Sequence, residues 1–261
     1  MSTSTTQPVQ SLVRGLQVIR SFGPSAPRQS LSEVATATGL ARATARRFLH
    51  TLVGEGYAAT NGSEFWLTPK VLELGYSFVS GLELPALAQP HLEALSQTID
   101  ESSSLSVLDG ADVVYVCRVP VRRIMTVNIT VGTRFPAHAT SMGRVLLAGL
   151  DDASLAQHLD HTQLAPLTPR TVTSPAQLRE ILHEVRLQGY SLVDQELELG
   201  LRSIAAPVTD PEGKVVAAVN ISTQTASYDL EHIETTLIPA LLRTTQAISA
   251  DITHAKEPYH A

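Results

Sequence analysis

The sequence contains a single cysteine, Cys117, among its 261 residues. One thiol cannot form a disulfide within the chain, and a cysteine-based metal site would need several. Apolar residues nowhere run for the roughly 18 positions that a membrane helix requires. The first ten residues are rich in serine and threonine and lack the apolar core of a secretory signal. We therefore expect a cytoplasmic protein with no cofactor, no bound metal and no membrane partner, whose residues 1–10 are disordered.

Acidic residues outnumber basic ones, and the formal net charge of −6 argues at first against a nucleic-acid ligand. The charge is unevenly distributed, however. Residues 1–70 carry seven Lys and Arg against three acidic residues, a net +4, whereas the remainder carries 12 basic and 22 acidic residues, a net −10. A basic head on an acidic body is typical of a protein whose first domain binds DNA. The chain length fits two domains.

The first 68 residues predict three helices followed by a hairpin. Ser30 and Glu33 have the spacing of a capping box, so one helix begins at Leu31, and Gly39 ends it. The Asn61-Gly62-Ser63 segment favours a tight hairpin turn. The predicted helices span residues 12–22, 31–38 and 40–54, and the predicted strands span 57–60 and 64–67.

The second and third of these helices have the pattern of a helix-turn-helix. Such a motif needs a small residue where the helices touch, here Ala35, and a glycine at the turn, here Gly39. Apolar residues close its core: Val34, Leu40, Ala45 and Phe48. The same periodicity turns the rest of the third helix outward, where arginine can contact guanine edges and phosphates. The predicted DNA contacts are Arg42, Ala43, Thr44, Arg46, Arg47 and, more weakly, His50. An arginine-rich, solvated helix face is the alternative interpretation.

The remainder of the chain mixes helices and strands, so the predicted fold class is α+β. Pro69 is placed to start a connecting helix, and Pro239 is expected to kink the last one. The predicted helices span residues 71–82, 86–99, 141–150, 153–159, 175–188 and 230–252. The predicted strands span 105–108, 113–119, 125–131, 191–193, 203–208 and 215–222.

This second part offers little for catalysis. His158 and His161 lie near Asp160 but lack a third metal ligand nearby in the sequence. No nucleophile elbow surrounds Ser141, so a triad with His138 and Asp194 is not supported. We therefore expect no enzymatic activity. An enzyme joined to a DNA-binding head remains as an alternative, and turnover of a ligand would identify it.

Small polar residues at strand ends and at a helix start favour a binding site instead. Residues 140–143 open a helix whose free backbone N–H groups are able to receive a carboxylate. Asn220 and Ser222 lie two apart on one strand and hence on one face, and Ser203 lies on another strand. Turn caps and a solvated sheet face are the alternative interpretation.

Several segments resemble the IclR family of bacterial regulators over about residues 11–253. They are 13–22, the arginine-rich third helix, 65–75, 136–147, 189–194 and 200–208. The resemblance implies operator DNA as a partner, palindromic operators, and a dimer or tetramer. It also implies a domain plan: a disordered start (1–10), a winged helix-turn-helix (11–68), a linker helix (69–82), a GAF-like effector-binding domain (83–255) and a tail (256–261).

The resemblance also implies where a small effector binds. The matching positions are Ser141, Met142, Asp194, Ser203, Asn220 and Ser222, with Ile124 and Val127 as an apolar wall. Two positions depart from some relatives: Ser141-Met142 stands where Gly-Ala is found, and Ser203 stands where cysteine is found. The effector therefore need not be the small 2-oxo acid that some relatives bind.

Residues 118–125, 131–137 and 140–144 are most similar to the subgroup that controls protocatechuate, 4-hydroxybenzoate and β-ketoadipate catabolism. This resemblance implies an aromatic acid or a dicarboxylate ring-cleavage product as the effector. Six arginines are possible carboxylate partners: Arg118, Arg122, Arg123, Arg134, Arg144 and Arg202. Surface ion pairing is the alternative for most of them. A second domain that only oligomerises is the alternative to an effector-binding one.

Overall fold

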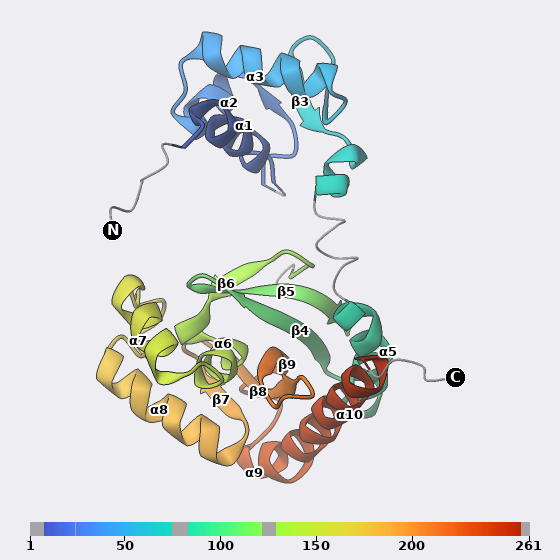
Figure 1. The fold of residues 1–261 in the computed structure, drawn as a ribbon, viewed down its shortest axis with the longest axis vertical. Coiled ribbons are helices and arrows are strands. Elements are labelled where there is room, and N and C mark those ends of the chain that lie inside the picture. The colour runs from blue at the N-terminus through green and yellow to red at the C-terminus, as the bar shows by residue number, and fades with distance from the viewer. Residues whose placement is uncertain (1–7, 24, 75–82, 122–128, 257–261) are drawn as a thin grey trace. The chain divides into compact units, whose positions relative to one another are not determined.

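The structure is a computed structural model that describes residues 8–23, 25–74, 83–121 and 129–256. The chain divides into two compact units, residues 1–81 and 82–261. Figure 1 shows both units, coloured along the chain. Each unit is described by itself below.

The described residues of the first unit contain the three expected helices and the expected hairpin, which a further short strand extends into a small sheet. Its elements are α1 (Gln10–Arg20), β1 (Gln29–Ser30), α2 (Leu31–Thr38), α3 (Arg42–Gly54), β2 (Ala58–Thr60), β3 (Glu64–Leu67) and the 3₁₀ turn η1 (Pro69–Leu72). The strands form an antiparallel sheet in the order β1-β3-β2. The two-residue strand β1 was not expected; Gln29 lies opposite Phe65 in it. The predicted winged helix-turn-helix is confirmed.

Local signals explain why α2 begins and ends where it does. The Glu33 carboxylate accepts a hydrogen bond from the Ser30 backbone N–H at 2.7 Å, and the Glu33 N–H donates to the Ser30 hydroxyl at 3.4 Å. These bonds satisfy two N–H groups that a helix start leaves free. Gly39 ends the helix with φ 66°, in the left-handed region that favours glycine. The predicted closing residues all belong to the core between the helices: Val34, Leu40, Ala45 and Phe48.

The connecting helix predicted over residues 71–82 is described only at its start. Residues 69–72 form the 3₁₀ turn η1, whose first residue, Pro69, supplies the fixed φ angle that suits a helix start. Residues 75–82 lie outside the described part of the chain.

The second unit is an α+β domain, which confirms the predicted class. Its helices are α5 (Glu83–Ile99), η2 (Ala137–Ala139), α6 (Ser141–Ala148), α7 (Asp152–His161), α8 (Pro175–Gln188), α9 (Leu230–His232), η3 (Ile233–Leu237) and α10 (Ile238–Lys256). Its strands are β4 (Ser102–Asp109), β5 (Asp112–Val119), β6 (Arg134–Pro136), β7 (Ser191–Asp194), β8 (Leu201–Thr209) and β9 (Val215–Gln224). The strands form one antiparallel sheet in the order β6-β5-β4-β9-β8-β7. No helix among the described residues is long and apolar enough to cross a membrane.

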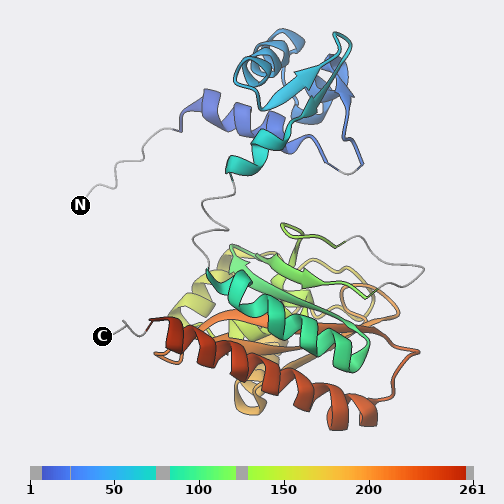
Figure 2. The same cartoon turned by 90° about the vertical axis from the view of Figure 1, so that its right-hand side faces the viewer.

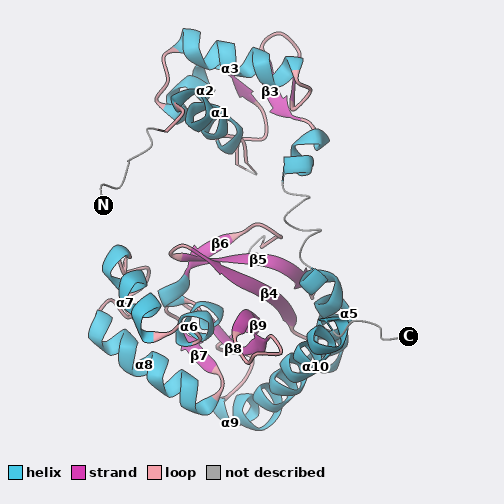
Figure 3. Ribbon diagram, viewed as in Figure 1, coloured by secondary structure: helices cyan, strands magenta, loops and turns pink. Residues whose placement is uncertain are grey.

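Helices cover both faces of this sheet (Figures 1 and 3). Helices α5 and α10 pack side by side against one face (Figure 2) and share a core with Leu105, Ile204 and Ile221. Helices α6 and α8 pack with the other face around Ala205 and Ala218. Alternate residues of each strand therefore point to different layers.

One strand differs from the sequence-based expectation, and the last helix has an additional feature. The strand predicted over residues 125–131 falls mostly outside the described residues, and 129–131 form no strand; β6 follows instead at Arg134. The last helix contains a π-helical turn, η3, just before Pro239. Proline has no N–H to bond the carbonyl four residues back, so a wider turn at this point is physically reasonable.

Candidate functional sites

The first candidate site is the exposed face of α3. Ala45 and Leu49 are buried and Phe48 packs beside them, so this side of α3 faces the core and the opposite side faces solvent. Five of the six predicted DNA contacts are exposed and Thr44 is half-buried; the exposed ones are Arg42, Ala43, Arg46, Arg47 and His50. Within the described residues, none of these three arginines forms an ion pair. Their guanidinium groups are thus available to phosphates and base edges.

The hairpin beside α3 has an ordered tip. The Asn61 side-chain oxygen accepts hydrogen bonds from the backbone N–H groups of Ser63 and Glu64, at 3.0 and 2.8 Å. Gly62 adopts φ +96°, a conformation that other residues rarely take. These features fix the turn that joins β2 to β3, as a wing against a DNA backbone requires.

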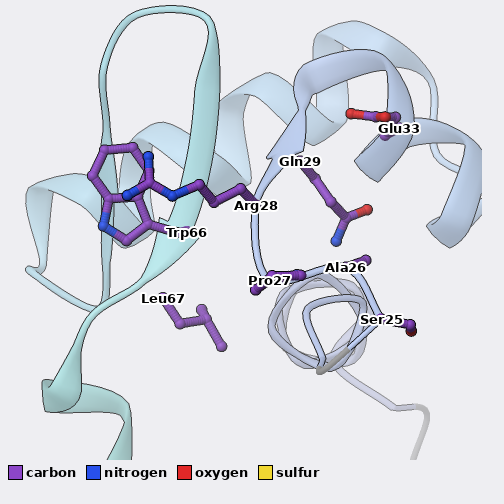
Figure 4. Close-up of a pocket in the computed structure, with 8 residues that line it drawn as sticks. All are labelled: Ser25, Ala26, Pro27, Arg28, Gln29, Glu33, Trp66 and Leu67. Atoms are coloured by element: carbon purple, nitrogen blue, oxygen red, sulfur yellow. The ribbon is translucent and has the colours of Figure 1, made fainter.

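A shallow depression of about 570 Å³ lies at the start of β1 (Figure 4). The Arg28 guanidinium lies over the Trp66 ring, 4.3 Å from its centre. Gln29 donates to the Ser21 carbonyl at 2.8 Å, and Glu33 caps α2. Because these polar groups already have partners, we interpret the depression as bracing between the chain before α2 and the hairpin.

The second candidate site is a cavity of about 1010 Å³ in the second unit. Strands β4, β5, β8 and β9, the start of α6 and residues 197–201 contribute to its lining. Of the six predicted effector contacts in the described residues, five line this cavity: Ser141, Met142, Ser203, Asn220 and Ser222. Ile124 and Val127 lie outside the described residues.

Small side chains make room for this cavity on the α6 face of the sheet. The register places Ser203, Ser222 and Ser102 in one cross-strand row. The next row contains Ala205, Asn220, Ser104 and Arg118. Ser102 and Ser104 were not predicted as site residues, although serines at the alternate positions 102, 104 and 106 indicate one polar face of a strand.

Two buried polar atoms in the cavity lining lack partners among the described residues. They are the Ser141 hydroxyl and the side-chain oxygen of Asn220. Asn220 uses its amide N–H to donate to the Ser222 hydroxyl at 2.9 Å. Buried polar groups are rarely left without a hydrogen bond. The cavity can therefore bond the polar groups of a ligand.

Arg118 supplies the positive charge in the cavity lining. It donates to the Ser104 hydroxyl at 3.0 Å and forms no ion pair among the residues described. Burial lowers its pKa from the usual value for arginine. Nearby, burial raises the pKa of Tyr115 to about 12, so this phenol keeps its proton.

The other arginines considered as carboxylate partners are engaged or undescribed. Arg134 pairs with Asp109 and Asp112, at 2.6 and 3.1 Å. Arg144 pairs with Glu196 at 2.6 Å, and Arg202 pairs with Asp194 at 2.9 Å. Arg122 and Arg123 lie outside the described residues. Four of the six arginines are described, and of these Arg118 alone has no acidic partner among the described residues. It is therefore the one available to a carboxylate ligand.

Asp194 does not line the cavity, contrary to the position implied by the family resemblance. It lies opposite Arg202 in the sheet, one residue out of step with Ser203, so it faces the other side. Its carboxylate accepts hydrogen bonds from Arg202 and Arg170, at 2.9 and 2.8 Å. Burial raises its pKa, but the hydrogen bond and the charge of Arg202 outweigh burial and lower the pKa overall. These pairs keep Asp194 from a ligand in the cavity.

The geometry of the described residues supports neither a catalytic triad nor a metal site. His138 bonds the Ala165 carbonyl at 3.1 Å, and Asp194 is held by its arginines. No hydrogen bond joins Ser141, His138 and Asp194 to one another in the described structure. His161 bonds the Gln157 carbonyl within α7. No group of three potential metal ligands occurs among the described residues.

Gly143 sets the position of α6 beside the cavity. A Cβ atom at this position would overlap the backbone of Ala137. We expect Gly143→Ala to lower the free energy of unfolding by about 1–3 kcal/mol, because overpacking forces the backbone apart. Denaturant unfolding checks this value. Gly54→Ala, with nothing near its added methyl, is the control and should not destabilise the protein. Equal stability of Gly143→Ala and wild type would contradict the tight contact.

Comparison with known proteins assigns both units. Residues 11–62 match the IclR helix-turn-helix domain, and residues 76–250 match the bacterial transcriptional regulator IclR C-terminal domain. A Pca regulon regulatory protein of Pseudomonas putida is 41% identical, covering 94% of this chain and 83% of the relative. The p-hydroxybenzoate hydroxylase transcriptional activator of Acinetobacter baylyi is 36% identical, covering 90% of this chain and 89% of its own.

A solved structure extends the likeness to a liganded protein. The crystal structure of an IclR homologue from Microbacterium hydrocarbonoxydans, complexed with 4-hydroxybenzoate, has a TM-score of 0.80 and 26% sequence identity. The match covers 93% of this chain and 98% of that one. The fold, the exposed arginines of α3 and the matched domains lead to one assignment. This chain belongs to the IclR family of DNA-binding transcriptional regulators.

Proposed function

We propose that the regulator responds to an aromatic carboxylic acid, or to a dicarboxylate formed by ring cleavage, and controls genes of aromatic catabolism. The observation that carries this proposal is a cavity lined by Arg118, which has no carboxylate partner among the described residues, together with buried hydroxyl and amide groups. An arginine pairs well with a carboxylate because charge-assisted hydrogen bonds are strong.

The lining also suits an aromatic ring. Tyr115, Ile129, Phe135 and Met142 supply apolar surface to the same cavity. Ser141 and Asn220 bring polar atoms without partners in the described structure, which are suited to a hydroxyl on the ring. The names of the relatives support this assignment: one is a p-hydroxybenzoate hydroxylase activator and another structure holds 4-hydroxybenzoate.

Ser141, Met142, Ser203, Asn220 and Ser222 form the proposed effector site with Arg118, and Ile124 and Val127 remain proposed wall residues. Asp194 is left out because its carboxylate is paired on the other face. Effector binding would alter how the two DNA-binding units of an oligomer are placed, through segment 69–82. Such a shift changes the population able to engage two half-sites at once.

The DNA-binding half of the proposal rests on α3. Arg42, Ala43, Thr44, Arg46, Arg47 and His50 form the proposed contact face. We propose a cytoplasmic dimer or tetramer on a palindromic operator, because two symmetric half-sites match two copies of α3. We propose no catalytic role, in line with the regulators that the chain resembles.

A ligand screen by thermal unfolding tests the effector assignment. 4-Hydroxybenzoate, protocatechuate and β-ketoadipate are each added to the full chain, with the neutral 4-hydroxybenzamide as control. A ligand at ten times its Kd should add about 1.4 kcal/mol to the free energy of unfolding. A shift with an acid that exceeds the shift with the amide supports the proposal. Equal or absent shifts for all three acids would refute it.

A further inference from the structure

A buried ion pair connects two walls of the effector cavity. Arg144 is 2% exposed and Glu196 is 8% exposed, and a guanidinium nitrogen of Arg144 lies 2.6 Å from a carboxylate oxygen of Glu196. Arg144 belongs to α6, and Glu196 lies in the segment between β7 and β8. Neither residue is among those that line the cavity.

The segment that carries Glu196 leads directly into the cavity wall. Residues 197–201 line the cavity. The segment folds back on itself: the Gln195 backbone N–H donates to the Leu201 carbonyl at 2.8 Å, and its side-chain oxygen accepts from the Gly200 N–H at 3.1 Å. Gln195 itself takes φ +63°, a strained value for a residue with a side chain. The position of this wall therefore depends on how its first residues are anchored.

Glu196 is the anchor on the inner side. The carboxylate oxygen that pairs with Arg144 also accepts a hydrogen bond from the Val172 N–H at 2.8 Å. The Glu196 carbonyl accepts one from the Thr171 hydroxyl at 2.7 Å. Arg144 is fixed in turn, because its Nε donates to the His138 carbonyl at 3.0 Å. One turn earlier in α6, Ser141 and Met142 form the opposite wall.

We propose that Glu196 is a positioning residue for effector binding. Through Arg144 it holds residues 197–201 at a fixed distance from the start of α6, so that the cavity is formed before the ligand arrives. A preformed site spends less binding free energy on ordering its own walls. This inference rests on the proposed function, since the ligand it concerns is the effector.

Glu196→Gln tests the proposal, because it keeps the size of the side chain and removes its charge. The affinity for 4-hydroxybenzoate should fall about tenfold or more, with faster dissociation. Without ligand, backbone amides 197–201 should exchange hydrogen faster than in wild type. Operator affinity without ligand should stay unchanged, since the pair lies in the second unit.

Asp194→Asn is the matched control. It makes the same carboxylate-to-amide change two residues away and removes charge from another arginine-paired carboxylate, one that faces the other side of the sheet. We expect its effector affinity to stay within about twofold of wild type. The rates of ligand dissociation and of amide hydrogen exchange are compared at a temperature where both variants are folded. Equal losses in the two variants would overturn the proposal, because they would report a general loss of stability.

Arg144→Lys keeps the test decisive if Glu196→Gln does not fold. Lysine retains the charge opposite Glu196 but lacks the planar group that also reaches His138. An intermediate loss of affinity and faster exchange at 197–201 are expected. Wild-type affinity and exchange in this variant would overturn the proposal. A wild type that binds no acid refutes the proposed function alone, since exchange without ligand still tests the positioning.

Discussion

Replacing Arg46 and Arg47 together by alanine is expected to weaken specific operator binding strongly. Both side chains are exposed on α3 and have no ion-pair partner among the described residues. A good arginine–base contact contributes about 1–3 kcal/mol, so losing two weakens binding by roughly thirtyfold or more. Fluorescence anisotropy with a labelled operator measures the Kd. Repeating it at several salt concentrations should show a shallower salt dependence if phosphate contacts are lost.

The control for this experiment removes the same charge elsewhere. Arg179 on α8 and Arg243 on α10 are exposed, and their double alanine variant changes the net charge equally. Its operator affinity should stay near that of wild type, and both double variants should bind effector normally. An unchanged operator Kd for the Arg46 and Arg47 variant would refute the assignment of α3 as the DNA-reading helix.

Replacing Arg118 by glutamine is expected to remove the response to effector while leaving operator binding intact. The substitution keeps a hydrogen-bond donor near Ser104 but removes the charge facing the cavity. Losing one partner of a desolvated charge pair costs about 2–4 kcal/mol, which corresponds to a roughly thirty- to thousandfold weaker Kd. Calorimetric titration with the acid that the screen identifies measures this loss.

Two comparisons make the Arg118 result specific to charge recognition. Arg134→Gln removes an arginine that already pairs with Asp109 and Asp112 and does not line the cavity, so its Kd should not change. The neutral amide of the effector should lose much less affinity than the acid in Arg118→Gln. If both ligands lost affinity equally, Arg118 would be a packing residue and the carboxylate would bind elsewhere.

The parts of the fold that could be predicted are those specified by signals between residues close together in the sequence. The capping box, Gly39 and the Asn61-Gly62 turn are local signals, and the structure confirms the elements that they predict. Strands β1 and β6 span only two and three residues and exist because distant strands pair with them, Phe65 with Gln29 and Val113 with Phe135. Short sequence windows contain no signal for such pairing.

The residues of the candidate site could be predicted only in part. Family resemblance placed Asn220 and Ser222 beside the cavity, and their spacing alone put them on one face. It misplaced Asp194, because a shift of one residue against Arg202 decides which face a side chain takes. The family resemblance also gave no means of choosing which of the six arginines binds a carboxylate. Arg144 and Glu196 are 52 residues apart, and only the folded chain shows that they pair.

Neighbouring residues of β4 serve two different layers of the second unit. Ser102 and Ser104 stand in the cross-strand rows beside the cavity, whereas Ser103 between them bonds the Ser96 hydroxyl and the Leu92 carbonyl of α5, at 2.8 and 3.1 Å. A ligand that displaces this strand by a fraction of an ångström must therefore stretch bonds to α5. That helix begins at Glu83, next in the chain after segment 69–82. Three consecutive serines thus join the cross-strand rows beside the cavity to the first helix of the second unit.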